Sequence, residues 1–174
     1  MDEVLIQNWN ERITADDTVY ALGDAFWKNE ENSIRIMQRL QGHKHLIQGN
    51  HDRVKGKLRP YWKSIEQYAE INDENRLVIL SHYPIPFYKN QHYGAVMLYG
   101  HVHNTREWEL VEKWKKAQWE LGIPSRLINV GCMMAYMNYT PRTLDELLEA
   151  NPQPMIERIR KDGTNAGENS NGEL

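Results

Sequence analysis

The chain has 174 residues, of which 40% are hydrophobic and 26% are charged, and its formal net charge is -3 at pH 7. A length and composition of this kind suit a single globular domain that buries its own core. The small acidic excess argues against a large nonspecific nucleic-acid surface, because such surfaces carry an excess of basic residues.

The first half of the chain predicts helices that alternate with short strands. Apolar residues recur at helical spacing from Val4 to Ile13 and indicate an opening amphipathic helix. Turn residues and short apolar runs then predict, in chain order, a strand at 19–22, a helix at 33–40, a strand at 45–48 and a strand at 64–71.

The second half continues this alternation. It predicts, in chain order, strands at 77–80 and 96–99, a helix at 107–121, a strand at 126–130 and a helix at 143–150. Thr143, followed three residues later by Glu146, has the pattern of a capping box at the start of the last helix. Alternating strands and helices indicate the α/β fold class.

No linker divides the chain, so we expect one domain at 1–150. Residues 151–174 are expected to hold a C-terminal helix and then a disordered tail, because Gly, Asn, Ser and Glu dominate the sequence from Gly163 onward. Cys132 is the one cysteine, so it has no intrachain partner, and an unpaired thiol favours a cytoplasmic location. We expect neither a signal peptide nor a membrane span, which would need an apolar run of about 18 residues.

Polar side chains suited to metal binding follow four of the predicted strands. The endings are Gly23-Asp24, Gly49-Asn50-His51-Asp52, Ser81-His82 and Gly100-His101-Val102-His103. In α/β sheets, functional sites form at the carboxyl ends of strands, and glycine allows the backbone to turn sharply there. We therefore expect five side chains to meet at one edge, namely Asp24, Asn50, His82, His101 and His103.

These residue types form a plausible ligand set. A carboxylate can bridge two cations, and imidazole suits Zn, Fe, Mn or Ni. Each ending also has an ordinary structural interpretation, since Asp24 would fit a plain turn and His82 a hydrogen-bonded structural role. The combination favours a metal site, because four of the seven histidines lie in these endings.

The four endings, in this order, resemble the successive motifs of the calcineurin-like metallophosphoesterases over residues 17–131. The resemblance implies a sandwich of two β-sheets flanked by helices, with a dinuclear metal centre at the strand ends. It also implies hydrolysis of phosphomonoesters or phosphodiesters by attack of a metal-bound hydroxide.

The same resemblance implies roles for the metal ligands. Asp24 resembles the carboxylate that bridges both ions. Asn50, His82 and His101 resemble the remaining ligands of one ion, and His103 resembles a ligand of the other. The implied cofactors are divalent ions, one or two per chain.

The Asn-His-Asp motif carries the implied catalytic residues. His51 resembles the residue that contacts the phosphate and protonates the leaving group, and Asp52 resembles the carboxylate that orients His51. Asn50 and His51 would therefore also contact substrate. Arg53 is a further candidate for a phosphate oxygen, with a solvated surface arginine as the alternative.

One family motif is absent from this sequence. The family begins with a strand that ends in Asp-x-His, whereas no histidine precedes His43 here and the first apolar stretch predicts a helix. The first strand is therefore expected to be missing, and Asp24 and His103 alone would serve the second ion. Three explanations remain open: a chain shortened at its N-terminus, a natural one-metal variant, or a relative that binds without catalysing.

The sequence thus supports two main hypotheses. The first is a metallophosphoesterase, a hydrolase whose substrate is a small-molecule or nucleotide phosphoester. The alternative is a shortened or non-catalytic metal-binding relative that acts as a binding or scaffold protein. A nuclease-like role is disfavoured by the net charge of -3, and the sequence leaves the oligomeric state undetermined.

Overall fold

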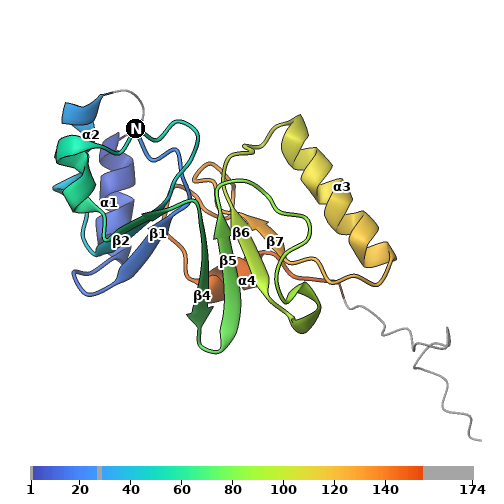
Figure 1. Cartoon of the computed structure of the whole chain (residues 1–174). Helices are drawn as coiled ribbons and strands as arrows, with labels where there is room; N and C mark the ends of the chain where they lie inside the picture. The colour runs from blue at the N-terminus through green and yellow to red at the C-terminus, as the bar shows by residue number, and fades with distance from the viewer. Residues whose placement is uncertain (1, 27–28, 155–174) are drawn as a thin grey trace, which may run out of the picture.

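The computed structural model describes residues 2–26 and 29–154, which form two β-sheets flanked by helices (Figure 1). The helices are α1 (Asp2–Arg12), α2 (Glu30–Met37), α3 (Arg106–Glu120) and α4 (Leu144–Ala150), with short 3-10 helices η1 (Gly56–Tyr61) and η2 (Gln91–Tyr93). The strands are β1 (Thr18–Ala21), β2 (His43–Ile47), β3 (Ser64–Glu66), β4 (Tyr68–Asp73), β5 (Arg76–Ser81), β6 (Val96–Tyr99) and β7 (Leu127–Asn129).

The order and direction of the strands bring several carboxyl ends together. One sheet has the order β1-β2-β3, and all of its strands are parallel. The other has the order β4-β5-β6-β7, with β4 antiparallel to β5 and the remaining pairs parallel. The loops after β1 and β2 therefore leave one edge of the first sheet, and those after β5 and β6 leave one edge of the second.

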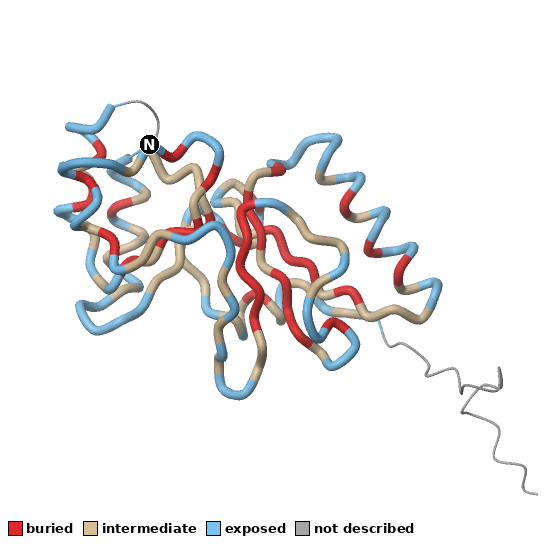
Figure 2. Tube along the Cα trace, in the orientation of Figure 1, coloured by how far each residue is buried: buried red, intermediate tan, exposed pale blue. Residues whose placement is uncertain are grey.

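Strands β5 to β7 of the four-stranded sheet are buried on both faces, as their largely buried tube shows, whereas β4 alternates exposed and half-buried residues (Figure 2). One face packs against Val111 and Trp108 of α3 through Ile79, Met97, Tyr99 and Leu127. The other face packs against Leu147 of α4 through Val96 and Ile128. Burial on both faces explains why these strands are continuous apolar runs in the sequence.

A cluster shared by both sheets holds them against each other. It consists of Leu22, which directly follows β1, Ile47 of β2, and Val78 and Leu80 of β5. The opposite face of the first sheet is covered by α2 and η1 through a second cluster of Met37, Leu46, Leu58 and Trp62. The shared cluster lies next to the ends of β1, β2 and β5, so it fixes the positions of the loops that leave them.

Apart from the segments 64–71 and 151–174, the predicted elements are present with small shifts at their ends. The helix predicted at 33–40 begins earlier, at Glu30, because the side chain of Asn29 caps it by accepting a hydrogen bond from the Asn32 backbone at 3.1 Å. The capping box of Thr143 and Glu146 is confirmed, with both reciprocal hydrogen bonds present. The predicted α/β class is confirmed as two sheets flanked by helices.

The single strand predicted at 64–71 is wrong. The segment forms two strands that belong to different sheets, because Ser64–Glu66 pairs with β2 whereas Tyr68–Asp73 pairs with β5. The chain crosses between the sheets at Gln67. The following hairpin turns at Glu74 and Asn75, whose φ angles of 48° and 68° are left-handed.

The C-terminal prediction is tested only in part. Residues 151–154 form no helix, and the rest of the predicted helix and tail at 151–174 lies outside the described residues.

β1 lies at the edge of its sheet, with β2 as its one neighbour among the described residues. No helix in the described part of the chain has the length and hydrophobicity that a membrane-spanning segment requires.

Replacing Leu46 with alanine is expected to lower the free energy of unfolding by about 2–5 kcal/mol, because it leaves a cavity among closely packed side chains. The side chain of Leu46 is 0% exposed, whereas that of Leu121 is 74% exposed. Leu121→Ala is therefore the matched control, with an expected change below about 0.5 kcal/mol. Urea denaturation followed by circular dichroism measures both, and equal losses would contradict the core position of Leu46.

Candidate metal centre

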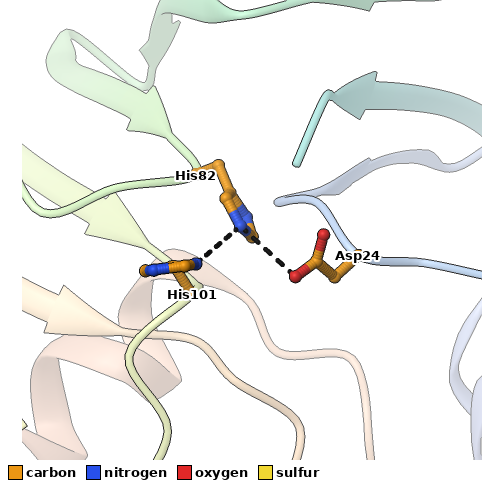
Figure 3. Close-up of side chains that lie close together, drawn as sticks. All are labelled: Asp24, His82 and His101. Carbon is orange, nitrogen blue, oxygen red and sulfur yellow. Dashed lines mark hydrogen bonds and ion pairs between the residues drawn. The ribbon is translucent and has the colours of Figure 1, made fainter. Parts of the chain in front are cut away.

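Three side chains from both sheets converge at the predicted edge. Asp24 follows β1, His82 follows β5 and His101 follows β6, and one ligand atom from each lies within 4.8 Å of the others. Figure 3 shows His82 between the other two side chains. Asn50, which follows β2, joins the group because its Oδ1 atom lies 3.1 Å from His82 Nε2.

The orientation of the His82 ring is fixed by a backbone carbonyl. The side chain is 2% exposed, and its Nδ1 atom lies 2.8 Å from the carbonyl oxygen of Leu22. A carbonyl oxygen can only accept, so Nδ1 carries the proton and Nε2 faces the cluster. A backbone carbonyl that fixes one ring nitrogen and directs the other is the usual arrangement behind a metal-binding histidine.

The atoms that face one another across the cluster fit a divalent cation. His82 Nε2 lies 3.1 Å from Asn50 Oδ1 and 3.5 Å from Asp24 Oδ2. All three atoms present lone pairs to one another, which repel. A positive ion between them would be bound by these lone pairs and would remove the repulsion. The mixed set of imidazole, carboxylate and amide oxygen suits Zn, Fe, Mn or Ni.

The electrostatics of His101 favour the neutral ring that a metal ligand requires. Burial lowers the pKa of His101 below its ordinary value, and the neighbouring His82 ring lowers it further by a smaller amount. These two effects outweigh Asp24, which raises the pKa. Its Nδ1 atom lies 3.2 Å from His82 Nε2. The lone pair of the His101 ring is therefore available at neutral pH.

The backbone is strained at two of the three cluster residues. Asp24 and His101 have φ angles of 52° and 56°, in the left-handed region that residues other than glycine seldom adopt. Strain of this kind persists only where the surroundings enforce it, and it concentrates at functional sites. The cluster is thus a preorganised arrangement of side chains.

Two glycines allow the loops to approach this closely. A Cβ atom at Gly23 would lie 2.2 Å from His82 Nδ1, and one at Gly49 would lie 2.4 Å from Asp24 Oδ1. Side chains at either position would occupy the space of the cluster itself. Gly23 and Gly49, which were predicted to allow sharp turns, therefore also allow the loops to pack closely against each other.

Asp52 ties the β1 and β2 loops together. Its carboxylate is buried and accepts backbone hydrogen bonds from Asp24 at 2.8 Å, Ala25 at 2.9 Å and Gly49 at 2.8 Å. The backbone N–H of His51 in turn donates to Asp24 Oδ1 at 2.9 Å. This clamp was not predicted, and the predicted role of Asp52 in orienting His51 remains a prediction.

Three further predicted residues are exposed and are not part of the Asp24, His82 and His101 group. His51 and Arg53 are exposed in the loop after β2. His103 is also exposed and is not part of the Asp24, His82 and His101 group, although it is near enough to contribute to the lowered pKa of His101. Its assignment to a second ion therefore stays a prediction.

Sequence reasoning missed Tyr83, which follows His82 directly. Its ring centroid lies 4.5 Å from that of His101 and 5.0 Å from that of His82. The available signal was its place in the sequence next to a predicted ligand. Such a neighbour of a strand end can point toward or away from the site, and the sequence does not decide which.

Comparison with known proteins gives relatives but no function. No family model matches the chain. An uncharacterised protein of Methanocaldococcus jannaschii, MJ1445, is 28% identical over 153 residues, which are 86% of this chain and 74% of that protein. A crystal structure of a protein of unknown function from Aquifex aeolicus, AQ665, is similar with a TM-score of 0.64 and 26% identity, covering 86% of this chain and 84% of the other.

Asp52→Asn is expected to weaken Mn²⁺ binding about 10- to 100-fold, because an amide nitrogen would face a backbone N–H that needs an acceptor. Isothermal titration calorimetry measures the affinity. Asp17→Asn is the matched control, since Asp17 also accepts from a backbone N–H, that of Thr14 at 2.7 Å, on an exposed turn. Unchanged affinity in Asp52→Asn would show that the clamp does not position Asp24.

His101→Ala is expected to remove the bound metal, because the variant keeps too few ligands to compete with water. Metal content per chain, measured by mass spectrometry after dialysis against Mn²⁺ and then buffer, reports this loss. His92→Ala makes the same change at an exposed residue in η2, before β6 rather than after it. Equal metal content in both variants would contradict the proposed centre.

Proposed function

We propose that this protein is a divalent-metal-dependent phosphoesterase that acts on small-molecule or nucleotide phosphoesters. The observation that carries the proposal is the convergence of Asp24, His82 and His101 within 4.8 Å, with Asn50 beside them. These are four of the ligand positions that the resemblance to metallophosphoesterases implies, and they come from four different strand ends.

The chemistry of phosphoesters explains why such a cluster would serve hydrolysis. A phosphoester is anionic, so charge neutralisation at its oxygens is the main requirement for attack. A bound divalent ion supplies that neutralisation and lowers the pKa of water. Asp24, Asn50, His82 and His101 would hold the ion, and the clamp at Asp52 keeps Asp24 in place.

The loop after β2 would supply the remaining functions. His51 is exposed next to Asn50, and its imidazole would hold the proton that the leaving oxygen needs. Arg53, exposed in the same loop, would contact a phosphoryl oxygen through its guanidinium group. Both side chains are exposed to solvent and would therefore be accessible to a substrate.

The position of His103 favours a second candidate. Because His103 lies outside the Asp24, His82 and His101 group, the described residues gather one cation site more clearly than two. A protein that binds one ion and a phosphorylated ligand without hydrolysis would fit that arrangement. Hydrolysis assays separate the two candidates.

His51→Ala is expected to lower kcat about 10²- to 10⁴-fold on 4-nitrophenyl phosphate or bis(4-nitrophenyl) phosphate with Mn²⁺, because the leaving oxygen loses its proton donor. Release of 4-nitrophenol measures the rate, and the metal content of the variant should equal that of the unchanged protein. His43→Ala is the matched control, because His43 is exposed at the start of β2 rather than after its end.

Two outcomes would contradict the proposal. Undiminished turnover in His51→Ala would remove His51 from the mechanism. A metal-loaded protein that hydrolyses neither ester, nor a panel of nucleotides and cyclic nucleotides, would favour the non-catalytic candidate.

A further inference from the structure

The aromatic ring of Tyr83 forms part of the wall of the metal centre. Its centroid lies 4.5 Å from the His101 ring at an interplanar angle of 58°, and 5.0 Å from the His82 ring at 76°. The backbone N–H of Tyr83 donates to Ser81 Oγ at 3.2 Å, which fixes the residue at the end of β5. The ring is therefore held by both histidines of the cluster.

Tyr83 nevertheless remains open to solvent. Its side chain is 48% exposed, although His82 beside it is 2% exposed. Within residues 2–26 and 29–154, the hydrogen bond of Tyr83 is made by its backbone N–H, and its hydroxyl group makes none. A rigid aromatic surface that contacts two metal ligands and also faces solvent is available to a molecule bound at the cluster.

The other strongly exposed aromatic residues of this segment do not share that position. Phe87 and Tyr93 are 70% and 89% exposed in the connection between β5 and β6. Tyr93 precedes the amino end of β6, whereas His101 follows its carboxyl end, and the four residues of β6 span about 13 Å. Exposure of Tyr83 is thus combined with contact to the cluster, and exposure of Tyr93 is not.

The position of the ring determines what it can recognise. A phosphoryl group bound at the cluster would lie beside His101, whose ring centroid is 4.5 Å from that of Tyr83, so its ester substituent would be able to reach the tyrosine ring. A planar aromatic substituent can stack on the tyrosine ring, whereas an alkyl substituent of the same size gains less from that contact.

We propose that Tyr83 makes the site selective for phosphoesters whose ester group carries a planar aromatic ring, either an aryl group or the base of a nucleoside. This inference rests on the proposed phosphoesterase function. Tyr83 is a specificity residue in this proposal, and neither metal binding nor proton transfer is assigned to it.

The test compares substrate pairs that differ in planarity. Phenyl phosphate is paired with hexafluoroisopropyl phosphate, a non-aromatic ester of similarly acidic alcohol, and AMP is paired with ribose 5-phosphate. Release of inorganic phosphate gives kcat/KM, and methyl diesters replace the first pair if the protein prefers diesters. Tyr83→Ala and Tyr83→Phe are measured beside Tyr93→Ala, which is the same change at the far end of β6.

Tyr83→Ala is expected to lower kcat/KM about tenfold or more on the aromatic member of a pair, mainly through KM, with little change on the non-aromatic member. Tyr83→Phe and Tyr93→Ala should keep the preference of the unchanged protein. A loss confined to phenyl phosphate would identify an aryl ester as the preferred substrate, and a loss on AMP would identify a nucleotide.

Equal losses on both members of a pair would overturn the proposal, because Tyr83 would then only support His101. An equal loss in Tyr83→Phe would overturn it too, because the hydroxyl would be the active group.

A binding experiment separates failure of this inference from failure of the proposed function. Phenylphosphonate and cyclohexylphosphonate are titrated calorimetrically into the Mn²⁺-loaded protein and its Tyr83→Ala variant. Tighter binding of phenylphosphonate that Tyr83→Ala abolishes would support the inference even if no ester is hydrolysed. Equal affinities of the two phosphonates for the unchanged protein would overturn it even if hydrolysis is confirmed.

Discussion

The close approach of the loops after β1, β2 and β5 is the constraint on which the rest of the site depends. Gly23 and Gly49 lack the side chains that would lie 2.2 Å from His82 Nδ1 and 2.4 Å from Asp24 Oδ1. The same proximity lets the Leu22 carbonyl reach the His82 ring and fix which nitrogen faces the cluster. Loops separated by ordinary side chains would hold the same ligand types too far apart to share one ion.

This arrangement carries an energetic cost that the surrounding fold must offset. Left-handed backbone at Asp24 and His101 costs about 1–3 kcal/mol for each residue. The apolar cluster shared by the two sheets, together with the buried Asp52 carboxylate and its three backbone donors, holds these conformations in place. The ligands are therefore ordered by the fold, and ion binding need not pay for ordering them.

The similar proteins from Methanocaldococcus jannaschii and Aquifex aeolicus are described as uncharacterised and of unknown function, so they do not indicate the chemistry of this chain. A shared fold does not determine chemistry, so the functional argument depends on the site. The cluster is the basis of the proposed phosphoesterase function, and the exposed ring of Tyr83 next to it adds a proposal about the substrate. The two proposals concern different parts of the substrate. The phosphoesterase proposal concerns neutralisation of the charge on the phosphoryl group, and the Tyr83 proposal concerns the shape of the ester group.

The sequence by itself determined the order of the strands and helices and the position of the ligands after strands. Both follow from local causes, because an apolar run favours a buried strand and a glycine allows the sharp turn that follows it. Only the tertiary structure decided that 64–71 divides between two sheets, that Asp52 clamps two loops and that Tyr83 faces His101. It also left His103 outside the group of three candidate ligands Asp24, His82 and His101. These features depend on strand register and on contacts between residues distant in sequence, which local patterns do not specify.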